Sequence, residues 1–235
     1  MTSAEVLSQL KTLGSESIKK VLVKHGAREP FYGVKVEELK KFQKKIKKDY
    51  RLSMELFDSG ISDAMYLAGL IADPEKMSKK DIQLWADRAY WYMLTEYPVA
   101  WAAAESKYGM ELALEWIESP KETIACAGWA TLGTIASITP DDKLDTKLYK
   151  KLIERVSKDI HKAPNRVRYT MNGFVLSSGA YITSLTDLAV KTGEKMGTIS
   201  VDMGGTACKV PFIPDYIKKL ETAGRLGKKR KAANC

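Results

Sequence analysis

The stretch KETIACAGWATLGTIAS, residues 121–137, predicts a helix that carries apolar side chains on more than one side. A surface helix has a single apolar stripe, so this helix is expected to lie between neighbouring helices. Other helical patterns precede and follow it, and breakers such as Pro120 and Pro140 separate them. The expected helical segments are residues 36–50, 62–73, 79–97, 99–109, 110–119, 121–137, 147–160 and 165–193.

A series of short helices with shared cores and no strand until near the end is typical of a helical-repeat solenoid. No residue pattern recurs at a fixed period, so only the number and spacing of the helices favour HEAT-like pairs. A globular helical bundle is the alternative. We expect an all-α HEAT-like (ARM/HEAT) superhelix forming one domain over residues 1–224, with a β-hairpin near residues 198–210 and a basic tail over residues 225–235.

The composition favours a soluble protein. Of its 235 residues 45% are hydrophobic and 29% charged, and no apolar run approaches the ~20 residues that a bilayer-spanning helix needs. The first residues lack the apolar region of a secretory signal. The three cysteines and two histidines are far apart in the sequence, so they have neither a disulfide pattern nor a metal-binding spacing. They are Cys126, Cys208, Cys235, His25 and His161. We therefore expect a cytoplasmic protein with no disulfide, metal or cofactor and no membrane partner.

The net charge of +9 is concentrated in three segments. Residues 35–51 hold eight basic and three acidic residues, residues 150–174 seven and two, and residues 218–235 seven and one. In the first segment, Lys40 and Lys44 lie opposite the apolar stripe of the expected helix. Three such clusters in one chain favour a polyanionic partner, with DNA as the main candidate.

The segment ISVDMGGTACKVP, residues 199–211, has two interpretations. An Asp-x-Gly-Gly-Thr sequence after a strand resembles the phosphate-binding hairpin of actin-like ATPases. Such a hairpin leads into a large α/β domain, whereas the residues after Thr206 read as helix and basic tail. We therefore expect a β-hairpin that pairs residues 198–202 with residues 206–210 across a glycine turn. Lys209 makes nucleic acid a candidate partner of this hairpin.

Four stretches resemble the bacterial DNA alkylation repair proteins, the AlkD-like HEAT-repeat family. They are EPFYGVKVEELKKFQKKI, DRAYWYMLTEYPVAWAA, NGFVL and VDMGGTACKVP, and the last of them is similar to a hairpin of the AlkF and AlkG branch. The resemblance implies a C-shaped superhelix whose basic concave face holds duplex DNA, and we expect a monomer that associates with the nucleoid when bound. It also implies, for the glycosylase members, cleavage of the N-glycosidic bond of cationic N-methylated purines.

The catalytic residues that the resemblance implies are matched only in part. In the glycosylases a tryptophan is followed four positions later by an essential aspartate, whereas here Trp91 is followed by Thr95. A register shifted by one residue would pair Tyr92 with Glu96, which makes Glu96 the candidate catalytic residue. The arginine of the next inner helix is replaced near Cys126, and a second active-site tryptophan is replaced by Phe174.

These positions define the candidate site. Arg88, Trp91 and Thr95 would share one helix face, and Arg166 and Arg168, close to Tyr169, would contact phosphates. Core packing is the alternative for Trp91, and a solvated helix start is the alternative for the two arginines. The full set of candidate DNA-binding residues is Arg88, Trp91, Thr95, Arg166, Arg168, Phe174, Lys209, Lys40 and Lys44.

Three functions remain open. The first is a DNA-binding member of the alkylation repair superfamily that lacks base excision and binds branched or distorted DNA. The second is an active alkylpurine glycosylase that uses Glu96 or another carboxylate. The third is a solenoid that binds an acidic protein and no DNA.

Overall fold

The computed structural model describes residues 1–234, and every regular element in this range is a helix. No helix among these residues has the length and apolar character needed to cross a membrane. The third cysteine, Cys235, lies outside the described residues. The elements are α1 Ser3–Leu13, α2 Glu16–Lys24, α3 Val36–Ile46, α4 Tyr50–Asp58, α5 Ser62–Ile71, α6 Lys79–Arg88, α7 Tyr92–Leu94, η1 Thr95–Val99, α8 Ala100–Glu105, α9 Gly109–Trp116, α10 Glu122–Ile138, η2 Asp141–Lys143, α11 Thr146–Asp159, η3 Ile160–Lys162, α12 Asn165–Tyr181, η4 Thr183–Leu185, α13 Thr186–Met196 and α14 Ile213–Thr222.

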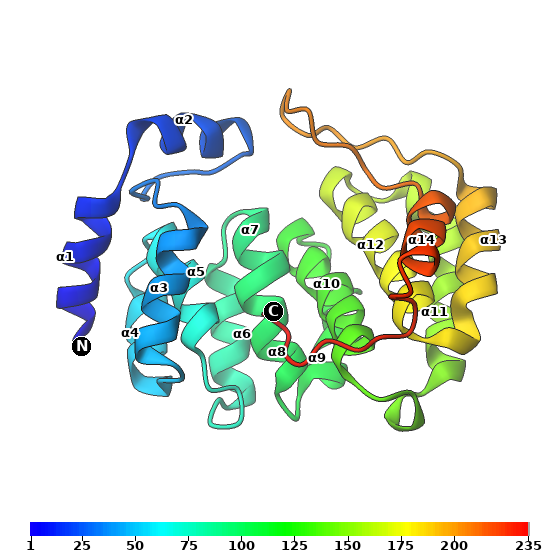
Figure 1. The fold of residues 1–235 in the computed structure, drawn as a ribbon, viewed down its shortest axis with the longest axis horizontal. Coiled ribbons are helices and arrows are strands. Elements are labelled where there is room, and N and C mark those ends of the chain that lie inside the picture. The colour runs from blue at the N-terminus through cyan, green and yellow to red at the C-terminus, as the bar shows by residue number, and fades with distance from the viewer. Residues whose placement is uncertain (235) are drawn as a thin grey trace.

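The helices form a two-layered row that runs from α1 at one end to α13 and α14 at the other (Figure 1). In the first layer, α3, α5, η1 with α8, α10, α12 and α14 contact one another in that order. The second layer consists of α4, α6, α9, α11 and α13, each packed on a member of the first. Each helix thus mainly contacts its neighbours in the row, which is the arrangement of a repeat solenoid and argues against a bundle.

Helix α10 explains why the row is closely packed. Its apolar residues are buried on several sides, and it contacts α8, α9 and α12, as its sequence predicted. A Cβ atom at Gly128 would lie 2.8 Å from both the backbone nitrogen and a methyl group of Ile117. Only glycine therefore permits the observed approach of α9 to α10.

The expected continuous helix over residues 79–97 is wrong. Helix α6 ends at Arg88, and Trp91 has an extended backbone with φ −153° before the chain becomes helical again. Residues Thr95–Val99 then form a π-helical turn that contains Pro98. Proline cannot donate the regular helical hydrogen bond and its ring crowds the preceding turn, so a wider turn accommodates it.

Residues 198–211 form a long loop, called here the bridging loop, and the expected β-hairpin is not observed because residues 1–234 contain no strand. The loop leaves α13, extends toward α2 and doubles back to α14 (Figure 1). The glycine turn is present, since Gly204 and Gly205 have φ values of 68° and 73°. Instead of a ladder between strands, the backbone of Asp202 bonds with the side chain of Asn165, and the Asn172 amide donates to the Pro211 carbonyl.

Candidate functional site

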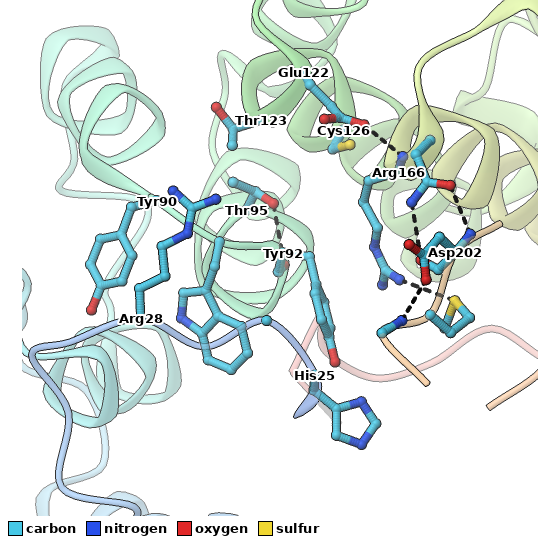
Figure 2. A pocket seen from close by; sticks show the side chains of 15 residues that line it. His25, Arg28, Tyr90, Tyr92, Thr95, Glu122, Thr123, Cys126, Arg166 and Asp202 are labelled. Atoms are coloured by element: carbon cyan, nitrogen blue, oxygen red, sulfur yellow. Dashed lines mark hydrogen bonds between the residues drawn. The ribbon is translucent and has the colours of Figure 1, made fainter. Parts of the chain in front are cut away.

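A hollow of about 450 Å³ lies where the bridging loop approaches the first half of the chain. It is bounded by the N-terminal ends of α10 and α12, by the residues around α7, by the segment after α2 and by the tip of the bridging loop (Figure 2). Two helix N-termini contribute partial positive charge here, and the walls carry the cations Arg28 and Arg166 as well as the carboxylates Glu122 and Asp202. Its walls contain the residues His25, Gly26, Arg28, Tyr90, Trp91, Tyr92, Thr95, Glu122, Thr123, Cys126, Asn165, Arg166, Asp202, Met203 and Gly204.

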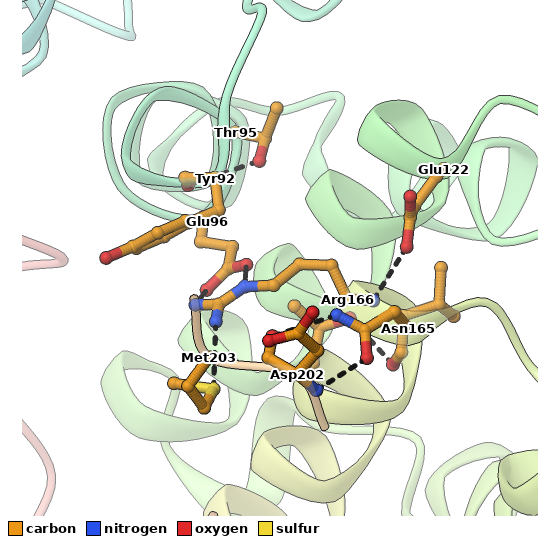
Figure 3. Close-up of polar contacts among 10 residues, drawn as sticks. Tyr92, Thr95, Glu96, Glu122, Asn165, Arg166, Asp202 and Met203 are labelled. Atoms are coloured by element: carbon orange, nitrogen blue, oxygen red, sulfur yellow. Dashed lines mark hydrogen bonds and ion pairs between the residues drawn. The ribbon is translucent and has the colours of Figure 1, made fainter. Parts of the chain in front are cut away.

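Glu96 and Arg166 form a buried ion pair beside this hollow (Figure 3). The Nε and Nη2 atoms of Arg166 donate to the two carboxylate oxygens of Glu96 at 2.5 and 2.7 Å. The side chains are only 6% exposed for Glu96 and 15% exposed for Arg166. Both oxygens of Glu96 are thus engaged by one guanidinium group, which is the strongest geometry for such a pair.

Two tyrosine rings enclose the guanidinium group. The centre of the guanidinium lies 3.8 Å from the ring centroid of Tyr92 and 3.9 Å from that of Tyr169. Tyr92 lies four residues before Glu96, and Tyr169 lies three residues after Arg166. Such cation–π contacts add to the ion pair, particularly where water is excluded.

Burial raises the pKa of the Glu96 carboxyl, and the hydrogen bonds and charge of Arg166 oppose that increase. The direction of this pKa shift matters for chemistry because a catalytic carboxylate must be ionised and present its negative charge to a reacting centre. Here the charge is neutralised by Arg166, and the surrounding protein excludes solvent. Tyr92 and Glu96 both contact the guanidinium group of Arg166, which engages both oxygens of the Glu96 carboxylate.

The bridging loop is tied to both halves of the site. The Asn165 side chain accepts from Asp202 N at 2.8 Å and donates to Asp202 O at 3.0 Å. At the tip of the loop, a Cβ on Gly204 would lie 2.3 Å from the Lys24 carbonyl oxygen, so glycine is required for this contact with the end of α2. Met203 Sδ lies 3.7 Å from Nη1 of Arg166, which places the loop directly over the ion pair.

Of the three candidate residues expected on a common surface, Trp91 and Thr95 both line the hollow, whereas Arg88 does not. Trp91 is 5% exposed and donates its indole hydrogen bond to Ser62, so it occupies a core position, although its edge reaches the hollow. Thr95 is buried, and its hydroxyl bonds back to the Tyr92 carbonyl. Arg88 pairs with Asp58 elsewhere, because the break after α6 abolishes the helical spacing.

The later candidates also divide into core and surface positions. Phe174 is fully buried, with its ring centroid 5.1 Å from that of Trp129 and 5.7 Å from that of Tyr149, so it packs in the core of the second half of the row. Arg168 is half-buried, and its Nε has no hydrogen-bond partner among the described residues. Arg166 serves the ion pair rather than free phosphate.

The three candidate lysines, Lys40, Lys44 and Lys209, are exposed.

Near the ion pair, Cys126 is buried, and burial raises the pKa of its thiol well above the usual range.

Sequence reasoning missed two polar residues of the site. Glu122, at the start of α10, accepts a hydrogen bond from the Arg166 backbone nitrogen at 2.6 Å. Asn165, the first residue of α12, holds the bridging loop. An acidic residue in the first turn of a helix is such a common stabilising feature that the sequence alone gives it no functional signal.

Comparison with known proteins identifies the family. The DNA alkylation repair enzyme family matches residues 6–180. The chain belongs to this family. It is also similar to a solved structure, described as a new family related to the HEAT-like repeat DNA glycosylases with affinity for branched DNA structures, at 34% identity and a TM-score of 0.91, with both chains fully covered.

Two curated Listeria proteins are similar as well. They are the uncharacterized protein Lin0241 of Listeria innocua and the uncharacterized protein Lmo0209 of Listeria monocytogenes. Each is 29% identical over 225 residues, which covers 93% of this chain and 97% of the relative. Family membership and the structural match together establish the HEAT-like helical-repeat fold.

Replacing Arg166 by methionine should leave the Glu96 carboxylate buried without a partner and lower the free energy of unfolding by ~3–5 kcal/mol near neutral pH. The loss should be smaller at pH 5 than at pH 8. With Arg166 absent, burial raises the folded-state pKa of Glu96 above its unfolded value, so the folded state holds the proton and stability falls as pH rises. Urea denaturation at several pH values measures this.

The double variant Arg166→Met with Glu96→Leu is the matched control. It removes both charges from the same volume, so we expect it to be more stable than the single variant and to lose the extra pH dependence. Equal stability of the two variants at every pH would contradict a charged, paired Glu96.

Proposed function

We propose that the protein binds branched or distorted DNA and does not excise bases. The observation that carries this proposal is the Glu96–Arg166 ion pair, which occupies the carboxylate nearest to the expected catalytic position. The solved structure with a TM-score of 0.91 comes from a family described as having affinity for branched DNA, which supports the choice of partner.

The chemistry of excision explains why the pair matters. Cleavage of the glycosidic bond of a cationic purine develops positive charge on the sugar, so the enzyme must place negative charge beside it. Thr95 has no charge, and the charge of Glu96 is balanced by Arg166 at 2.5 and 2.7 Å. The proposed protein therefore retains the scaffold of the family with an ion pair in place of a free carboxylate.

Basic groups at the hollow and elsewhere on the surface support DNA as the partner. Helix N-termini and exposed basic side chains attract phosphate groups without reading the bases. Arg28 lines the hollow, Lys209 is exposed on the bridging loop, and Lys40 and Lys44 are exposed on α3. We propose that these residues, with Arg168, contribute to DNA binding, while Arg166 acts through the ion pair.

The bridging loop is proposed as a direct DNA contact. It spans from α13 to the end of α2 above the hollow, so DNA that approaches the hollow must meet it. The loop takes the role that we had expected of a β-hairpin, and it does so as an irregular segment held by Asn165. Residues 198–211 are therefore the part of the chain most suited to sensing a branch point.

An active alkylpurine glycosylase is the second candidate function. Two carboxylates other than Glu96 line the hollow, Glu122 and Asp202. Each has one oxygen engaged by a backbone N–H, at Arg166 and Gly204 respectively, which leaves the other oxygen available to a substrate. A third function, capture of an acidic protein, would use the same basic surface without DNA.

Binding should favour a four-way junction or a fork over linear duplex of the same length, and it should weaken steeply between ~50 and ~200 mM salt. For duplex DNA the logarithm of affinity falls by about 0.9 per neutralised phosphate for each tenfold rise in salt. Fluorescence anisotropy with the three DNA forms measures both effects. A flat salt profile or a complete lack of DNA binding would favour the protein-partner function.

Incubated in excess with DNA that contains 7-methylguanine or 3-methyladenine, the protein should release no more base than the spontaneous background. An active glycosylase serves as the positive control, and released bases are quantified by chromatography. Release above background would contradict the proposal. The variants Glu96→Gln, Glu122→Gln and Asp202→Asn would then identify the carboxylate responsible.

The substitution Gly204→Ala should weaken junction binding more than Gly205→Ala does. Both glycines have positive φ and suffer similar backbone strain, but only a Cβ at position 204 meets the Lys24 carbonyl, whereas position 205 has no atom within 4 Å. The pair therefore separates docking of the loop from strain. Equal junction affinities of the two variants would show that docking of the loop on α2 does not matter for binding.

A further inference from the structure

The C-terminal tail, residues 225–234, runs along the ends of the first-layer helices (Figure 1). It bonds in turn to the last turns of α12, α10, α8 and α5, so it crosses most of the row. The contacts are Gly227 N to Ala180 O at 2.8 Å, Arg230 N to Ser137 O at 2.8 Å, Ala233 N to Glu105 Oε1 at 2.7 Å and Asn234 Nδ2 to Leu70 O at 3.2 Å.

All these contacts lie at helix C-terminal ends, which carry partial negative charge and unsatisfied carbonyl groups. The tail supplies both the missing donors and positive charge. Lys229 donates to the Ala136 carbonyl at 2.8 Å and pairs with Asp141 at 2.8 Å, and Ala233 is completely buried. These tail residues stabilise the fold, and their hydrogen-bond donors and charge are already engaged within the protein.

Two lysines of the tail have no such role. Lys228 and Lys231 lie on either side of the anchoring residues Lys229 and Arg230, and both are exposed. Lys231 lines a hollow of about 810 Å³ whose walls also carry Lys44 of α3, Lys47 and Lys48 just after it, and the acidic residues Glu75 and Glu105. Lys228 and Arg225 line an adjoining hollow of about 680 Å³, which shares Lys231.

Two basic segments that are distant in the sequence therefore meet on one surface. None of the six residues has an ion-pair partner within the described part of the chain. Satisfying helix ends does not require these exposed charges, so their convergence needs another explanation. We call this surface the tail surface, defined by Lys44, Lys47, Lys48, Arg225, Lys228 and Lys231.

We propose that the tail surface binds the phosphate backbone of a second duplex arm. The candidate site lies at the N-terminal end of α10, and the tail contacts the opposite end of the same helix. Seventeen residues at 1.5 Å per residue separate the two surfaces by about 25 Å. Two separate basic surfaces suit a branched DNA, whose arms diverge from one point, better than a single straight duplex.

This inference rests on the proposed function, because it assigns the partner of the tail surface from the same class of DNA. The charge alone would also suit an acidic protein, but anchoring along the row fixes the lysines relative to the first hollow. A rigid spacing between two cationic surfaces fits a partner whose charges are themselves rigidly spaced. Duplex arms meet that condition.

The test uses the full chain with Lys44, Lys228 and Lys231 all replaced by glutamine. Its matched control replaces Lys11, Lys80 and Lys191 by glutamine, three exposed lysines on α1, α6 and α13 that lie outside both hollows and have no ion pair among the described residues. Both variants lose the same charge, and melting temperatures establish that both remain folded.

We expect the tail variant to bind a four-way junction about tenfold more weakly than the control at ~50 mM salt, with a shallower salt dependence. Linear duplex should be affected much less. Hydroxyl-radical footprinting of the junction should show protection on two arms with the unaltered protein, and loss of protection on one arm with the tail variant.

Equal losses on junction and linear DNA, or no loss relative to the control, would overturn the inference while leaving the proposed function in place. A single protected arm with the unaltered protein would do the same. If the unaltered protein binds none of the DNA forms, the proposed function fails and the assignment of the tail surface fails with it.

Discussion

The ion pair between Glu96 and Arg166 organises the centre of the molecule. It joins residues 70 positions apart, one on the π-helical turn η1 and the other on the first turn of α12. Removing two charges from water costs several kcal/mol per ion, and this cost must be offset by excellent geometry. Here two short charge-assisted hydrogen bonds and two stacked tyrosines supply it. The loop, the hollow and the start of α12 are all arranged around this pair.

The same pair determines what the site can do. A carboxylate in the centre of a DNA-binding scaffold is useful to catalysis only while its charge is free to act on the substrate. In this chain the guanidinium takes that charge, and Met203 of the bridging loop lies over the guanidinium. The same guanidinium therefore contacts both the Glu96 carboxylate and the tip of the bridging loop.

The sequence was sufficient for the fold class because α10 is apolar on several sides, a property that only neighbours on both flanks explain. The same sequence misled where a local break intervened, since the pattern of residues 79–97 gives no sign that Trp91 is extended. The sequence analysis named Glu96 as a candidate carboxylate. It could not name Arg166 as its partner, because no local rule connects residues 70 positions apart. The prediction of a hairpin was wrong because the Asp202 backbone bonds to the Asn165 side chain, and the backbone bond from Thr206 N to Met203 O closes only the turn.

Stability alone does not explain a buried ion pair at this place, since apolar residues of similar volume often stabilise a protein as well or better. Geometry offers a reason. Helices η1 and α12 both pack on α10, so the pair connects second neighbours of the row across the helix between them. In a repeat solenoid the contacts between first neighbours leave small rotations that accumulate into curvature. A directional contact between second neighbours restricts that rotation beside the hollow, and it thereby holds η1 and α12 at a fixed distance across α10.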